Sequence, residues 1–132
     1  MTEQEYITML IKQSEDDLGA SEALANAGYF AHSLFWAHLV LEKLCKALWI
    51  HRNHNLHYPY IHNLLRLLKE SNQTLTNEQI EFFAEMNQFQ SHGRYIDAFQ
   101  KMESTISKEM CFKYIETTKK QQQWLIEQMQ QK

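Results

Sequence analysis

Histidines, lysines and arginines gathered between residues 43 and 69 are the side chains whose chemistry stands out. Lys43 and Lys46 are three positions apart, and His62, Arg66 and Lys69 follow one another at steps of four and three. On a helix, each set would project from one face, and cationic groups arranged in this way can bind phosphate. We therefore predict an anion-binding surface here; the alternative is an ordinary solvated face.

The distribution of charge favours the anion-binding interpretation. The formal net charge of the 132-residue chain is -3, which excludes a protein that binds nucleic acid through bulk basicity. Residues 43–69, however, contain five basic side chains and no carboxylate, whereas the rest of the chain has 8 basic and 16 acidic residues. A solvated face usually mixes both signs, so this segregation suggests one selective basic surface.

Other chemistries lack the necessary motifs. His38 and Glu42 would share a helix face, but no HExxH or CxxC motif accompanies them, and we interpret them as a surface pair near the edge of the structure. Three scattered glycines cannot form a phosphate loop or a dinucleotide fingerprint, and no serine or cysteine has a recognisable paired base. We expect no metal site and no cofactor.

The pattern of apolar residues predicts the elements that position these side chains. Periods of three and four indicate helices over Thr2–Asn26, from Phe30 through Leu48, and over the further ranges 60–70, 77–89 and 104–130. Gly28 would end the first helix in a left-handed conformation, and Thr76 or Asn77 would cap the fourth. The segment HRNHNLHYPY loses the helical period and is predicted to be a loop. The last helix has a seam with two polar members, which we expect to be partly solvated or to pack on a partner.

Composition sets the fold class. With 44% hydrophobic residues, 3 glycines and 1 proline, the sequence favours long helices, and we predict one all-α domain over residues 1–132, an up-and-down antiparallel bundle of four to five helices. Cys45 and Cys111 lie in apolar helical stretches, which favours a reducing compartment. The first residues, MTEQEYITML, do not form a signal peptide, and no apolar run is long enough to span a membrane. We expect a cytoplasmic protein with no membrane contact.

Four segments, in order and spacing, resemble the HEPN domain (higher eukaryotes and prokaryotes nucleotide-binding), over nearly the whole chain. They are Tyr29 at the start of the second helix, the "EKxxKAL" run containing Glu42, Lys43 and Lys46, the "HNL" of residues 62–64, and the pair Arg94-Tyr95. The resemblance implies an all-α bundle that often dimerises, a nucleotide- or RNA-related role, and a minimal nucleotidyltransferase as partner. Arg94 and Tyr95 are then candidate ligand contacts. Alternatively, Arg94 forms an ion pair across helix ends and Tyr95 packs its ring.

The resemblance also implies a possible activity. Many HEPN members are metal-independent ribonucleases that use an Arg, usually followed by a polar residue, and a His four to six positions after the Arg. Arg94 occupies the corresponding region, but residues 95–100 contain no histidine, and His92 precedes it. Arg52, Asn53 and His57 fit the spacing in what we predict to be the wrong element, where a chance match is the simpler explanation. His57 could still act as a general base and Arg52 could stabilise a charged phosphorane.

These observations lead to a first interpretation with two alternatives. We predict a catalytically degenerate HEPN module that forms a homodimer, binds nucleotide, RNA phosphate or an acidic partner, and belongs to a toxin-antitoxin-like pair with a minimal nucleotidyltransferase. Its ligand contacts would be Lys43, Lys46, His62, Arg66, Arg94 and Tyr95. The first alternative is an HEPN ribonuclease toxin acting through Arg52, His57 or Arg94, and the second is a structural adaptor that only dimerises.

Overall fold

Every regular element that the computed structural model describes, over residues 1–90 and 96–130, is helical. The long helices are α1 (Glu3–Asn26), α2 (Phe30–Asn53) and α6 (Lys108–Gln130). The shorter elements are α3 (Leu64–Glu70), α4 (Asn77–Met86), the 3₁₀ turn η1 (Asn87–Phe89) and α5 (Ile96–Thr105). The predicted all-α helical bundle is confirmed.

Local signals fix the ends of several helices. Thr2 caps α1 and Thr76 caps α4, each through a capping box in which the threonine side chain and the third helical residue bond to each other's backbone. Gly28 has a φ of 89°, a left-handed conformation that glycine adopts without steric cost, and this glycine separates α1 from α2. Tyr29 is the residue that precedes the first turn of α2, as its position in the sequence predicts.

The boundary between α2 and the following loop differs from the sequence prediction. Helix α2 continues through His51, Arg52 and Asn53, and it ends at His54, whose φ is 51°. Ile50 is fully buried, and the Asn53 amide donates to the backbone carbonyls of Trp49 and Glu70, so packing extends the helix where the apolar period has already stopped. Arg52 therefore lies in the last turn of α2 and not in a loop.

Three other predicted ranges are also corrected. Helix α3 starts at Leu64 and not at Tyr60, because the Asn63 side chain caps it by accepting from the Arg66 N–H. The fourth predicted helix consists of α4 and η1 in succession. The last helix begins at Lys108, and α5, a separate helix that we did not predict, precedes it.

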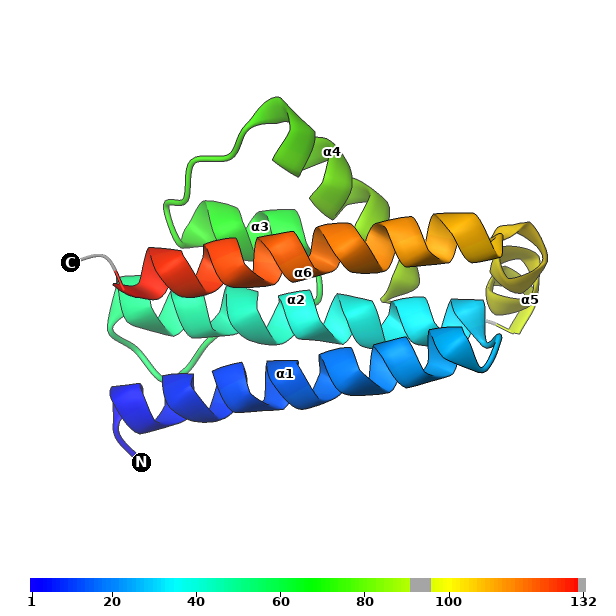
Figure 1. Ribbon diagram of the computed structural model, residues 1–132. Helices are drawn as coiled ribbons and strands as arrows, with labels where there is room; N and C mark the ends of the chain where they lie inside the picture. Colours follow the sequence, from blue (N-terminus) through cyan, green and yellow to red (C-terminus); the bar gives the residue numbers. More distant parts are fainter. Residues whose placement is uncertain (91–95, 131–132) are drawn as a thin grey trace.

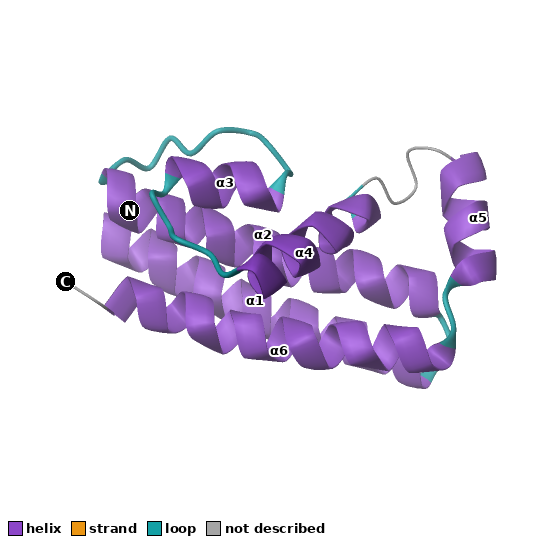
Figure 2. Cartoon of the chain, turned by 90° about the horizontal axis from the view of Figure 1, so that it is seen from above, coloured by secondary structure: helices purple, strands orange, loops and turns teal. Residues whose placement is uncertain are grey.

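The long helices lie side by side, as Figure 1 shows, with α2 in contact with both α1 and α6. α1 and α2 form an antiparallel pair. The shorter helices α3, α4 and α5 return the chain to the end of the molecule at which α2 begins, so α6 runs alongside α2 in the same direction. In Figure 2, α3 and α4 lie over the long helices, and α5 stands at one end.

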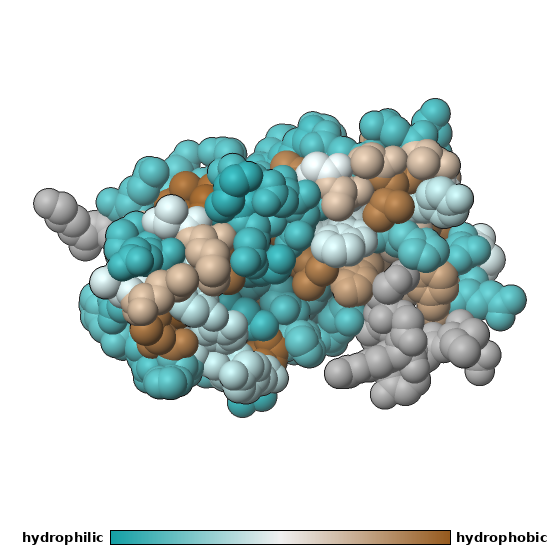
Figure 3. Space-filling view, turned by 90° about the horizontal axis from the view of Figure 1, so that it is seen from below, coloured by the Kyte–Doolittle hydropathy of each residue, from teal (hydrophilic) through white to brown (hydrophobic). Residues whose placement is uncertain are grey.

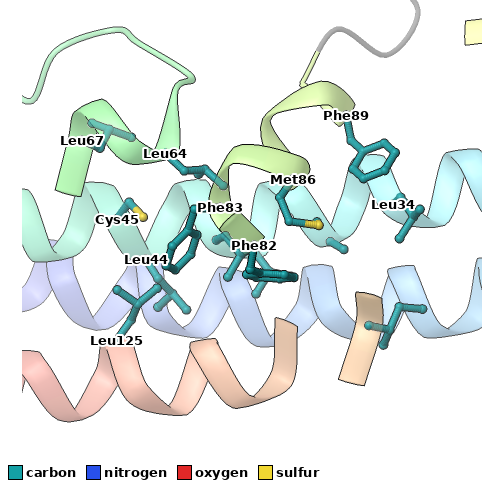
Figure 4. Packing of buried hydrophobic residues seen from close by; sticks show 14 of the residues in the cluster. Leu34, Leu44, Cys45, Leu64, Leu67, Phe82, Phe83, Met86, Phe89 and Leu125 are labelled. Atoms are coloured by element: carbon teal, nitrogen blue, oxygen red, sulfur yellow. The ribbon is translucent and has the colours of Figure 1, made fainter. Parts of the chain in front are cut away.

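The hydrophobic core lies between α2 and the elements around it. Figure 4 shows Phe82, Phe83 and Met86 extending from α4 toward side chains of α2 and α6. Leu44 on α2 and Leu125 on α6 are fully buried in the same cluster. Cys45 and Cys111 are free thiols within this core, where burial raises the pKa of both.

The polar members of the α6 seam are buried, contrary to the expectation of a solvated end. Thr118 is fully buried and donates to the Tyr114 carbonyl, and Gln122 donates to the Ser14 hydroxyl of α1 at 3.4 Å. Thr118 is therefore satisfied within α6, and Gln122 joins α6 to α1 of the same bundle.

The surface of the α1 side carries hydrophobic side chains in two groups, which a hydrophilic stretch separates (Figure 3). In the described ranges, none of the helices combines the length and the apolar character that crossing a membrane requires.

Candidate functional site

A single carboxylate, that of Glu42, organises the polar side chains of the predicted basic region. It lies on α2 with His38 one turn before it and Lys46 one turn after it, on a helix whose other buried positions are mostly apolar. His38, Glu42 and Lys46 are only 1%, 6% and 9% exposed, respectively. Together with His62 they form what we call the Glu42 cluster. The prediction of a surface pair for His38 and Glu42 was therefore wrong.

Each oxygen of Glu42 has a different hydrogen-bonding partner. Lys46 Nζ donates to Oε2 at 3.0 Å, and His62 Nδ1 lies 2.8 Å from Oε1. His38 Nδ1 is farther from Oε1, at 3.8 Å. A buried carboxylate with two such partners has its charge compensated, which is the condition under which charged groups persist inside a protein.

These contacts fasten the loop after α2 to the middle of that helix. His62 belongs to the segment that leads into α3, and its side chain is 47% exposed. The next residues of the "HNL" segment have separate roles, since Asn63 caps α3 and Leu64 is fully buried. The "EKxxKAL" and "HNL" segments of the sequence therefore meet at Glu42.

The surroundings lower the pKa values of Glu42 and His38. Burial alone would raise the pKa of Glu42, but Lys46 and His62 more than offset it, and the pKa falls below its ordinary value. Burial lowers the pKa of His38 to about 4, against smaller raising effects from Glu42 and from a hydrogen bond with the His62 backbone. His38 is therefore neutral at physiological pH, and its Nε2 has no hydrogen-bond partner among the described residues.

Tyr58, itself in contact with Tyr6 of α1, covers Lys46. The Lys46 ammonium lies 5.2 Å from the centre of the Tyr58 ring, within cation–π distance. The Tyr58 and Tyr6 hydroxyls are 3.2 Å apart, and this hydrogen bond together with burial raises the pKa of Tyr58 to about 12. Lys46 is therefore enclosed, and a ligand could reach its ammonium only by displacing these side chains.

Two further predicted cations, Lys43 and Arg66, are paired with carboxylates from outside residues 43–69. Lys43 Nζ lies 2.7 Å from Asp17 Oδ2 of α1, and Arg66 Nε lies 3.0 Å from Glu70 Oε2. Folding thus brings to the basic segment the acidic side chains that its sequence lacks. The Arg66 side chain is 63% exposed, so this ion pair can exchange with another anion at small cost.

Arg52 and His57, the candidate catalytic pair, have separate hydrogen-bond partners. The Arg52 guanidinium donates to the Ser71 carbonyl at 3.1 Å and to Gln73 Oε1 at 2.7 Å, so it holds the turn after α3 against the end of α2. His57 is exposed, and its backbone N–H donates to the Asn55 side chain. Arg94 and Tyr95 lie outside the described residues. Within the described ranges, no group of three or more His, Cys, Asp or Glu side chains could hold a metal ion.

Sequence reasoning missed Glu42 and Asp17 as parts of this site. A usable signal existed for Glu42, because it is the only acidic residue of α2 and has a histidine four positions before it and a lysine four positions after it. A polar stripe on an apolar helix indicates a buried network. Asp17 gave no such signal, because Glu15 and Asp16 precede it and the three together look like a solvated run.

Comparison with protein families gives one match. The family model of the HEPN domain matches residues 7–129, nearly the whole chain, including both segments that meet at Glu42. Comparisons with curated proteins and with solved structures give no match.

Proposed function

From the fact that the chain belongs to the HEPN domain family, which implies a nucleotide- or RNA-related function, we propose that it is a binding module for nucleotide or RNA phosphate. The observation that carries the proposal is the position of His62. Its Nδ1 is fixed by Glu42, whereas nearly half of the side chain is exposed beside α3. A ring oriented in this way offers Nε2 to a ligand.

Two further cations extend the proposed surface along α3. Arg66 and Lys69 follow His62 by four and seven positions, and both are exposed. Arginine suits phosphate because its planar guanidinium can donate two parallel hydrogen bonds. Lys43 and Lys46 already form ion pairs with Asp17 and Glu42. We therefore assign these two lysines a smaller part in ligand contact than the sequence alone indicated. Arg94 and Tyr95 remain proposed contacts.

We further propose that the module has lost the cleavage chemistry found in many members of its family. No histidine occurs after His92 anywhere in the chain, so Arg94 cannot be followed by the catalytic histidine. Arg52, the arginine with a suitably spaced histidine, has its guanidinium engaged by the turn after α3. We also propose that the protein acts as a homodimer alongside a minimal nucleotidyltransferase in a toxin-antitoxin-like pair; copurification of the two would test this.

Titration of the full chain with ATP and with a 12-nucleotide single-stranded RNA, by isothermal calorimetry at several salt concentrations, tests the binding proposal. Replacement of Arg66 and Lys69 by Gln should weaken RNA binding at least tenfold. It should also reduce the slope of log K against log salt by about 1.4, because two phosphate contacts are lost from a single strand. Intact RNA after prolonged incubation is expected as well.

The matched control replaces Lys12 and Lys108 by Gln, which removes the same charge from exposed positions on α1 and α6. This control should bind as the wild type does. The proposal is wrong if neither ATP nor RNA binds, or if the control loses as much affinity as the α3 variant.

A further inference from the structure

A groove between α4 and α6 lies apart from the Glu42 cluster and is not used by the proposed function. Two hollows, of about 330 and 430 Å³, follow one another along these helices and share Glu78, Phe82 and Thr117 in their linings. Among the described residues, two hydrogen bonds cross it, from Tyr114 to Glu85 and from Gln79 to Gln121. Because the two hollows share these lining residues, they form one groove along the seam, and the two hydrogen bonds bridge it.

The α6 side of the groove presents one face of a helix. Five of its lining residues recur at steps of four, three, four and three: Met110, Tyr114, Thr117, Gln121 and Trp124. At a rise of 1.5 Å per residue this face is about 21 Å long, the length of a helix of about 14 residues. Met110 is 42% exposed, so an apolar surface remains open at one end.

The α4 side of the groove is acidic. Glu78, Glu81 and Glu85 line it at steps of three and four, all of them exposed. In the described part of the chain, neither Glu78 nor Glu81 has an ion-pair partner, unlike the acidic residues around the basic segment. Phe82 lies between these glutamates at the floor. The hollow lined by Phe82 and Met110 thus has a largely apolar floor, and the hollow lined by Gln121 is more polar. Three carboxylates follow one wall, and Glu78 and Glu81 among them have no ion-pair partner in the described part of the chain.

From this arrangement we infer that the α4–α6 groove binds an amphipathic helix of a partner protein whose apolar face carries a row of lysines or arginines along one edge. Apolar side chains at helical spacing would fill the floor, and the basic edge would face the three glutamates. The exposed Lys113 and Lys120 on the opposite wall suit an acidic or neutral second edge. The inference does not depend on nucleotide or RNA binding.

Fluorescence anisotropy with labelled synthetic helical peptides of 16 residues tests the inference. The first peptide has leucines at steps of three and four, a lysine edge and a glutamate edge, and the second differs only in having its lysines replaced by glutamate. The full chain should bind the first peptide at least tenfold more tightly than the second. Glu78→Gln with Glu81→Gln should weaken binding of the first peptide at least fivefold, and Thr117→Arg, which fills the groove, should abolish it.

The matched control, Glu15→Gln with Glu127→Gln, removes two exposed carboxylates outside the groove and should leave peptide affinity unchanged. Equal affinity for the two peptides, no binding of either, or an equal loss in the control would overturn the inference. A dimer seen by sedimentation velocity that Thr117→Arg dissociates would also overturn it, because the occupant would then be a second copy of the chain. Circular dichroism of each variant separates these results from a loss of folding.

Discussion

His38 shows what burial does to a single titratable side chain in this protein. Its ring is almost completely enclosed, its Nε2 has no hydrogen-bond partner among the described residues, and its pKa falls to about 4 from 6.5. In the unfolded chain the same ring would take up a proton near its ordinary pKa. Between these two pKa values, protonation therefore favours the unfolded state.

The stability of the protein should accordingly decrease on acidification. With a lowered folded-state pKa, the contribution of His38 is complete above about pH 6.5 and is lost as the pH falls toward 4. The loss should be on the order of 3 kcal/mol, because each tenfold difference in proton affinity between the folded and unfolded states corresponds to about 1.4 kcal/mol. Urea unfolding measured at intervals from pH 7.5 to pH 4 gives this dependence, and His38→Gln should flatten it.

His54→Gln is the control for this pH dependence, because the His54 side chain is 76% exposed. It should leave the slope as in the wild type. If His38→Gln retained the full slope, another group would be responsible for the acid destabilisation.

Connections between elements depend on a few polar contacts. Asn63 and Asn87 link the start of α3 to η1, since Asn87 donates to Asn63 Oδ1 and its own Oδ1 accepts from the Leu64 N–H. Arg52 holds the turn after α3, and Glu42 holds the loop before it. The segment from residue 62 to residue 73 is therefore fastened to α2 at both of its ends.

Glu42→Gln should release the earlier of these two connections. The change keeps the size of the side chain but leaves the enclosed Lys46 ammonium without its counterion, so we expect a loss of about 3 kcal/mol in the free energy of unfolding. Chemical denaturation gives this value, and hydrogen exchange should show faster exchange in the loop before α3.

Glu70→Gln provides the comparison, because it removes a carboxylate from an exposed ion pair with Arg66 and should cost about 0.5 kcal/mol or less. Comparable losses of unfolding free energy in the two variants would show that burial does not determine how much Glu42 contributes to stability.

Sequence patterns predicted the helices more accurately than they predicted the contacts between helices. The apolar period, with Gly28 as a helix end and Thr76 as a candidate cap, located α1, α4 and the start of α2, because these signals are local. The end of α2 was missed because Ile50, Arg52 and Asn53 are held by tertiary contacts. The Glu42 cluster was missed for the same reason, since residues 42 and 62 are neighbours only after the loop folds back.

At the scale of the whole molecule, the segregation of charge along the chain largely disappears on folding. Of the five basic side chains between residues 43 and 69, Lys43, Lys46 and Arg66 have carboxylate partners at positions 17, 42 and 70. Those partners lie just outside the segment or on another helix. The surface that remains is a small cationic one on α3, on a protein of net charge -3.

Removing two of these partners should make the molecule bind polyanions more strongly. Asp17→Asn with Glu70→Gln frees Lys43 and Arg66, so elution from heparin should require a higher salt concentration. Glu15→Gln with Glu127→Gln changes the net charge equally, from two exposed positions on α1 and α6. If the two variants eluted at the same salt concentration, total charge and not local pairing would set polyanion binding.

The parallel course of α2 and α6 has a consequence for the order in which the protein assembles during synthesis. α1 and α2 are consecutive and can pair as soon as both have left the ribosome, whereas Leu125 and Ile115 of α6 complete the same core from much later in the chain. Until then, the apolar side of α2 that α6 covers stays open to other molecules, and such surfaces attract chaperones or cause aggregation. The Ser14–Gln122 bond, between residues 108 positions apart, can form only at the end of this process.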